Sequence, residues 1–176
     1  IRDRAKIAVS SFDEGVDPVG ACVGLRGSRV QAVVQELRGE AIDIIPFSPD
    51  PTHFVIDAIA PANVTKCILD TESRSIDLIV PDNQLSKAIG RHGQNVRLAS
   101  QLTQWKIDIY SETKHNEIND LATKELSRIS LLDDEDILIL IRHKYLTLTD
   151  VYDATEEDIM DLLGFTEEEA EEVIQA

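Results

Sequence analysis

The chain has 176 residues, a hydrophobic content of 43%, a formal net charge of −16 and two cysteines. It has no apolar run of about eighteen residues, the minimum for a membrane helix, and Cys22 and Cys67 are far apart without CxxC spacing. We therefore expect a soluble, cytoplasmic protein of one large or two to three small domains, with no membrane segment, metal or cofactor.

The negative charge is concentrated in the C-terminal third of the chain. Residues 1–112 carry 12 Lys and Arg against 15 Asp and Glu, whereas residues 113–176 carry 5 against 18. Such an asymmetry predicts a domain boundary near residue 112. It also leaves the first region free to be locally basic at its loops.

Residues 4–44 predict a strand, two helices and a second strand. Alternating apolar and polar residues indicate a strand over 4–10, followed by a polar connector over 11–17. A short helix over 19–23 leads into the glycine-bracketed loop 24–27. The next helix, 28–37, has apolar residues at the i, i+3, i+4, i+7 spacing of one buried face, and a strand follows at 42–44.

The segment 46–51 contains three prolines and predicts a rigid linker to a second unit. This unit is expected to contain a helix over 52–59, strands over 64–70 and 75–80, a helix over 83–89, a second glycine-bracketed loop over 90–93, a helix over 94–102 and a strand over 105–110. Trp105 could stack on a nucleic-acid base, but we interpret it as core because it starts an alternating strand.

The two loops belong to an internal repeat, since the first glycines, Gly24 and Gly90, stand 66 positions apart in the same pattern. Each copy reads helix, GxxG, helix, strand, and a one-residue gap brings 41–44 onto 106–109. The full order over 50–111 resembles a type II KH domain. The first copy lacks the opening helix and strand, so either this pair was lost or the chain is a fragment whose missing piece lies upstream.

The resemblance implies an α+β fold with two tandem type II KH domains, in which a three-stranded sheet carries helices on one face. We expect the first, N-terminally truncated, over residues 1–47 and the second over 48–112. A linking helix is predicted over 113–130 and a small all-α domain over 131–176.

The GxxG loops are the candidate RNA-binding sites. Such a loop presents main-chain N–H groups at a helix N-terminus, and glycine lets a phosphate approach without a Cβ in the way. KH domains hold single-stranded nucleic acid in this manner. An isolated GxxG is more often an ordinary turn, but two copies in one frame favour the binding role. The candidate RNA-binding residues are Gly24, Leu25, Arg26, Gly27, Ser28, Arg29, Lys87, Gly90, Arg91, His92, Gly93, Gln94, Asn95 and Arg97.

Apolar residues beside these loops have two interpretations that are compatible. They would form the bottom of a groove under the bases, or pack in the core. These residues are Val23 and Val30 in the first copy and Ile89 and Val96 in the second. We expect both roles together.

From residue 117 the apolar pattern is helical throughout. A helix is predicted over 133–144, and Thr155 and Thr166 each precede acidic residues as helix N-caps. The two helices that they begin are joined by residues 163–165, and the region resembles helix-hairpin-helix units. Its acidic surface would repel a nucleic-acid backbone, so we expect a protein partner or an autoinhibitory contact with the KH face.

Catalytic motifs are missing from the sequence. There is no GxSxG, Walker or HExxH pattern, and no His with Cys or Ser at a spacing that suggests a nucleophile and its base. We therefore expect a protein that is not an enzyme.

Residues 17–31 and 88–100, which surround the two loops, closely resemble the NusA family of bacterial transcription factors. The resemblance implies binding of nascent single-stranded RNA and of RNA polymerase, with effects on pausing, termination and antitermination. It also implies that a polymerase-binding domain and an S1 domain precede Ile1, and we expect a monomer. The alternatives are a KH accessory module of an RNA-processing enzyme or ribosomal protein, and a protein-interaction scaffold.

Overall fold

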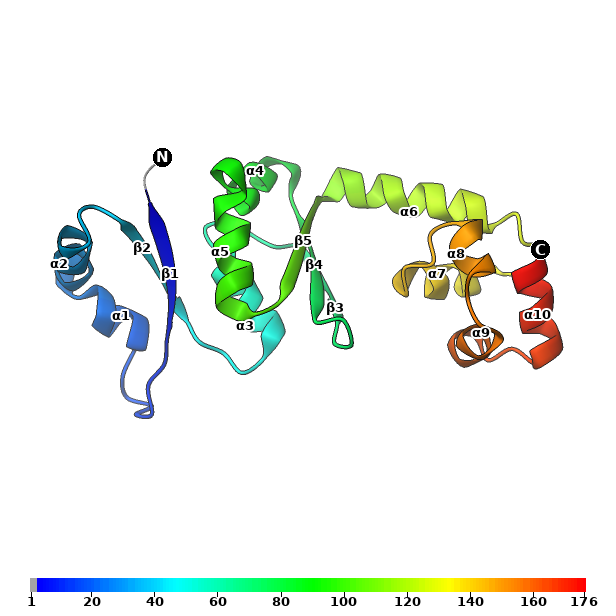
Figure 1. Cartoon of the computed structure of the whole chain (residues 1–176), viewed down its shortest axis with the longest axis horizontal. Helices are drawn as coiled ribbons and strands as arrows, with labels where there is room; N and C mark the ends of the chain where they lie inside the picture. The colour runs from blue at the N-terminus through cyan, green and yellow to red at the C-terminus, as the bar shows by residue number, and fades with distance from the viewer. Residues whose placement is uncertain (1–2) are drawn as a thin grey trace. The chain divides into compact units, whose positions relative to one another are not determined.

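The computed structural model describes residues 3–176 (Figure 1). Contacts divide the chain into two units, one ending at Glu112 and the other running from Thr113 to Ala176. Among the described residues, all strands lie in the first unit.

The first domain is a two-stranded sheet with two short helices. Strands β1 (Arg4–Val9) and β2 (Ala41–Pro46) pair in parallel, from Arg4 opposite Ala41 to Val9 opposite Pro46. Helix α1 (Pro18–Val23) begins with proline, whose fixed φ suits the first turn. After the loop comes α2 (Ser28–Glu36). Strand β2 is longer than the predicted 42–44 because it pairs with β1 along its whole length.

The second domain has the topology expected of a type II KH domain. Its elements are α3 (Pro51–Ala58), β3 (Lys66–Asp70), β4 (Ser75–Val80), α4 (Leu85–Ile89), α5 (Gln94–Thr103) and β5 (Lys106–Ser111). The sheet order is β3-β4-β5, with β3 antiparallel and β5 parallel to the central strand. The expectation of an α+β fold with tandem KH domains is confirmed.

The core of this domain lies between the sheet and its helices. Every residue of β4 is buried, as a central strand covered on both faces requires. Trp105 is 9% exposed and belongs to the same apolar cluster, which confirms its interpretation as core. The Arg74 guanidinium lies 5.7 Å from the centroid of the indole ring and covers it.

The two KH domains share this core. Ile45 of β2 is 3% exposed and lies in the same cluster as Phe54 and Ile59 of the second domain, with Ala8 of β1 packed against it. Phe47 and Phe54 contact edge to face, with ring centroids 5.3 Å apart. The proline linker is therefore short, since Pro46 still belongs to β2 and Pro51 already begins α3.

The second unit is helical. Its elements are α6 (Glu112–Leu126), which starts at the end of the first unit, α7 (Asp134–Arg142), α8 (Leu148–Tyr152), α9 (Glu156–Leu163) and α10 (Glu167–Gln175). The linking helix begins directly after β5 and ends before the predicted 130, because the chain turns at 127–130 and buries Ile129 and Leu132 in the helical core. Helix α8 was not predicted, although Thr147 and Asp150 have capping-box spacing.

Capping boxes begin α7, α8, α9 and α10. At α9 the Thr155 hydroxyl accepts the Asp158 N–H at 3.1 Å, and the Asp158 carboxylate accepts the Thr155 N–H at 3.3 Å. At α10 the N–H and then the hydroxyl of Thr166 lower the pKa of Glu169. The contribution of that carboxylate is therefore present at neutral pH and lost as the pH falls through its folded-state pKa.

Removing one cap tests its contribution. We expect Thr155→Ala to lower the free energy of unfolding of the helical unit by about 1 kcal/mol, because the Asp158 N–H loses its acceptor. Urea denaturation followed by circular dichroism measures it. Thr155→Ser keeps the hydroxyl and should remain close to the unsubstituted chain; an equal loss in both variants would contradict the capping role.

Candidate nucleic-acid interface

The two GxxG loops have the same backbone conformation. The first glycines, Gly24 and Gly90, have φ/ψ of 75°/174° and 76°/172°. The third residues, Arg26 and His92, have 52°/30° and 52°/28°. The second glycines have 77°/15° and 72°/16°. The repeat seen in the sequence is thus a repeat of geometry, residue by residue.

The two glycines of each loop are required for different reasons. A Cβ on Gly90 would lie 2.8 Å from both the backbone nitrogen and the Cβ of Asn95, and one on Gly24 would lie 2.7 Å from Cγ of Arg29. A Cβ on Gly93 would meet nothing within 4 Å, and one on Gly27 would meet Cγ1 of Val30 at 3.8 Å, an ordinary contact. The first glycine therefore allows the chain to pack against itself, while the second leaves open space in front of the loop.

Cationic and polar side chains surround that open space. Arg26 and Ser28 are exposed at the first loop, and Lys87, Arg91, His92 and Arg97 at the second. Leu25 is 85% exposed although it is apolar, so it contributes nothing to the core. Helices α2 and α5 begin directly after the loops and direct their N-terminal N–H groups there.

Asn95, one of the candidate RNA-binding residues, is bonded to the protein backbone. It is 7% exposed, and its Nδ2 donates to the carbonyl oxygens of Ile59 and Ala88 at 3.0 Å, with the Lys87 oxygen at 3.3 Å. Its amide nitrogen therefore braces the loop against the end of α4. A buried carboxamide needs such partners, and the carbonyls at a helix end supply them.

Arg29 occupies the equivalent position of the first loop and also braces it. Its Nη1 donates to the Ala21 carbonyl oxygen, near the end of α1, at 2.7 Å. Arg29 as a residue is nevertheless exposed. Alignment of the two copies places Arg29 on Asn95, and this shared polar position was the available signal for a brace.

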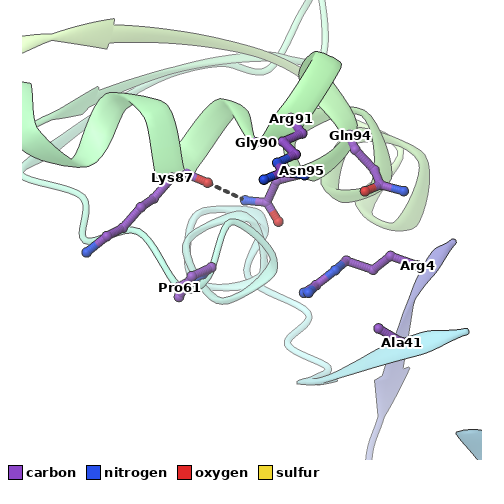
Figure 2. A pocket seen from close by; sticks show the side chains of 8 residues that line it. All are labelled: Arg4, Ala41, Pro61, Lys87, Gly90, Arg91, Gln94 and Asn95. Atoms are coloured by element: carbon purple, nitrogen blue, oxygen red, sulfur yellow. Dashed lines mark hydrogen bonds between the residues drawn. The ribbon is translucent and has the colours of Figure 1, made fainter. Parts of the chain in front are cut away.

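A cavity of about 290 Å³ adjoins the second loop (Figure 2). Lys87, Gly90, Arg91, Gln94 and Asn95 line it together, so the structure gathers these five predicted residues. Its remaining lining residues, Arg4, Ala41 and Pro61, were not predicted. Arg4 and Ala41 come from the first domain, and Figure 2 shows the Arg4 side chain extending from β1 toward Asn95 and Pro61.

A buried ionic network lies at this junction. The Lys6 side chain is 0% exposed, and its Nζ lies 3.1 Å from Oδ2 of Asp43 and donates to the Ala60 carbonyl oxygen at 3.2 Å. Arg4 Nη1 donates to Oδ1 and Oδ2 of Asp43 at 2.7 and 3.0 Å. Burial lowers the pKa of Lys6, against the opposing effect of Asp43. One carboxylate thus holds two cations, one of which bridges to the second domain.

Across residues 3–176 no helix has both the length and the apolar character needed to cross a bilayer. Nor do three or more His, Cys, Asp or Glu side chains of these residues gather as a metal site would require.

Known proteins resemble this chain most clearly in the KH region. Residues 1–47 match the NusA-like first KH domain and residues 51–117 the NusA-like second KH domain. The transcription termination/antitermination protein NusA of Bacillus subtilis is 52% identical over 133 residues, which are 76% of this chain and 34% of that protein. The protein of the same name from Halalkalibacterium halodurans is 49% identical over 134 residues, 76% of this chain and 35% of its own length.

A more distant solved structure, entitled "Crystal structure of APE1850", is 22% identical with a TM-score of 0.48, over 62% of this chain and 80% of that one. The chain spans about a third of the length of the two curated relatives. On the two domain matches and the identity to these relatives, the chain belongs to the NusA family and carries its tandem KH domains.

Proposed function

We propose that this chain is the single-stranded RNA-binding region of a bacterial transcription elongation factor. It acts in the cytoplasm as a monomer without catalysis, and it modulates pausing, termination and antitermination through nascent RNA and RNA polymerase. The observation that carries the proposal is the pair of loops with one conformation, flanked by exposed cations, in which an added Cβ on the second glycine would meet no atom closer than 3.8 Å. The relatives' name, transcription termination/antitermination protein, supports the process.

RNA binding at each loop follows from its geometry. A phosphate approaches the backbone at Gly27 or Gly93, where no Cβ stands in the way, and accepts N–H groups at the start of α2 or α5. Arg26, Arg91 and the neighbouring cations add charge. Each KH module clamps about four nucleotides, and contacts to phosphates dominate over contacts to bases.

The apolar residues beside the loops support contact with the bases. Val96 packs partly against the core, whereas Ile89 is 36% exposed next to Gly90. Val96 therefore stabilises the domain, while Ile89 is available to an unstacked base. The acidic helical unit, in this proposal, contacts protein or masks the KH face in place of binding RNA.

Reversing the charge of the loops tests the function. We expect Leu25→Asp/Arg26→Asp, and separately Arg91→Asp/His92→Asp, each to weaken single-stranded RNA binding at least tenfold, because phosphates then meet carboxylates. Aspartate tolerates the left-handed conformation at the third loop position, so the fold should persist. Fluorescence anisotropy with a labelled oligonucleotide measures the affinity, and circular dichroism checks the fold.

The matched control is Ser127→Asp/Arg128→Asp, which changes the charge by the same amount at two exposed positions of the helical unit. It should leave RNA affinity within about twofold, since both positions lie outside the two GxxG loops and salt screens exposed surface charge. Unchanged affinity in both loop variants would contradict the RNA-binding role and favour the protein-interaction scaffold.

A further inference from the structure

We propose that the cavity between the two KH domains holds a phosphate of the RNA strand. In this proposal Arg4, from the first domain, binds the phosphate beside the GxxG loop of the second domain. This inference rests on the proposed RNA-binding function and adds a residue that lies outside both GxxG motifs. It concerns the cavity lined by Arg4, Lys87 and Arg91, which we call the seam pocket.

The lining of the seam pocket selects an anion. Its three charged residues, Arg4, Lys87 and Arg91, are all cationic, and none of the lining residues is acidic. Among the described residues, Lys87 and Arg91 form no ion pair within 4.0 Å. The charge of Lys87 and Arg91 is therefore available to a phosphate, whereas that of Arg4 is shared with Asp43.

The size of the pocket suits one unit of a nucleic-acid backbone. Its volume of about 290 Å³ lies at the lower limit of the range usual for ligand sites, about 300–1,000 Å³. It therefore admits a phosphate with its sugar. Gln94 and the backbone at Gly90 provide the polar lining beside the cations.

Arg4 is positioned for this contact and keeps donors to make it. Both of its bonds to Asp43, at 2.7 and 3.0 Å, come from Nη1. A guanidinium has five N–H donors, so Nη2 and Nε still have hydrogens for a phosphate oxygen. The carboxylate fixes the side chain without cancelling the local charge, because the same Asp43 also contacts the cation of Lys6.

The pocket is continuous with the candidate RNA site. Gly90, Arg91 and Gln94 belong both to the second loop region and to the pocket lining, while Arg4 and Ala41 belong to the strands of the first domain. A strand held at the second loop thus reaches the first domain through the seam pocket. Since the cationic contacts there are to phosphate, we expect affinity without base preference.

The test compares Arg4→Gln with the unsubstituted chain in RNA titrations at several salt concentrations. We expect binding about fivefold weaker, equally for different RNA sequences, and a slope of log K against log salt reduced by about 0.7, the value for one single-strand phosphate contact. Arg4→Lys keeps the charge and should retain most of the slope. Arg128→Gln, in the helical unit, removes the same charge and should match the unsubstituted chain.

Two further measurements separate the outcomes. If Arg91→Asp/His92→Asp weakens binding at least tenfold while Arg4→Gln leaves affinity and slope unchanged, the seam proposal is wrong and the RNA-binding function stands. If Arg4→Gln and both loop variants leave RNA affinity unchanged, both proposals fail. Competition by inorganic phosphate at constant ionic strength identifies the source of the anion. Displacement of RNA by micromolar phosphate in the unsubstituted chain, but not in Arg4→Gln, would assign the pocket to a free anion and overturn the proposal.

Discussion

Replacement of Asp43 by asparagine is expected to destabilise the tandem KH unit by about 3 kcal/mol, because it leaves the Lys6 ammonium buried without its anion. The Lys6 side chain is 0% exposed and Asp43 only 23%, so water cannot replace the lost carboxylate fully. Lys6 would retain neutral acceptors only, the Ala60 carbonyl oxygen at 3.2 Å and the side-chain amide oxygen of the new asparagine. Urea denaturation of the chain, followed by the fluorescence of Trp105 in the shared core, measures the loss.

Two companion variants identify Lys6 as the cause. Arg4→Gln removes the exposed partner of Asp43 and should cost less than about 1 kcal/mol, as surface ion pairs do. Lys6→Met combined with Asp43→Asn removes both buried charges and should recover most of the stability. A loss in Asp43→Asn no larger than that in Arg4→Gln would show that the pair does not hold the domains together.

The pH dependence gives a second measurement of the same effect. Burial lowers the pKa of Lys6 in the folded chain, so between that value and the ordinary lysine pKa, about 10.4, the unfolded chain binds more protons. Stability contributed by this group therefore rises with pH in that interval. Without Asp43 the folded pKa falls further, so the deficit of Asp43→Asn should narrow as the pH is raised from 7 toward 10.

Gly90→Ala is expected to destabilise the same unit by about 3 kcal/mol, whereas Gly93→Ala should cost about 1 kcal/mol. Gly90 has φ 76° and ψ 172°, a region that only glycine occupies readily, and an added Cβ would lie 2.8 Å from the backbone nitrogen of Asn95. Gly93 has φ 72° and ψ 16°, which alanine adopts at a smaller cost, and open space in front of it.

The same two variants separate stability from binding. Gly93→Ala should remain folded and still weaken RNA binding several-fold, because its methyl group occupies the space that the phosphate uses. Denaturation and anisotropy on the same samples provide both values. Equal destabilisation by the two substitutions would contradict the distinction between a packing glycine and an access glycine.

Features encoded within one repeat could be predicted from the sequence. The GxxG spacing, the helices on either side and the closing strand all appear twice, and Thr155 and Thr166 stand at the cap positions that their spacing indicates. These are local signals, in which a few neighbouring residues determine backbone geometry.

Features that depend on contacts between the two domains could not be predicted in this way. Arg4 reaches the seam pocket from a strand 83 positions before Lys87 along the sequence, and no pattern links the two. Lys6 looks like an ordinary polar residue of an alternating strand until the second domain covers it. Asn95 was predicted as an RNA-binding residue in the first turn of its helix, and the sequence pattern did not indicate that the packing of α5 buries it.

The shared apolar cluster has a consequence for how the loops can act together. Ile45 and Ala8 complete a core that otherwise belongs to the second domain, so each KH domain is part of the scaffold of the other. The interval between the two loops is then a property of this packing and not of the length of residues 47–50. Under the proposed function, only a single-stranded segment long enough to span this fixed interval contacts both loops at once. A shorter or more structured RNA binds one loop at a time.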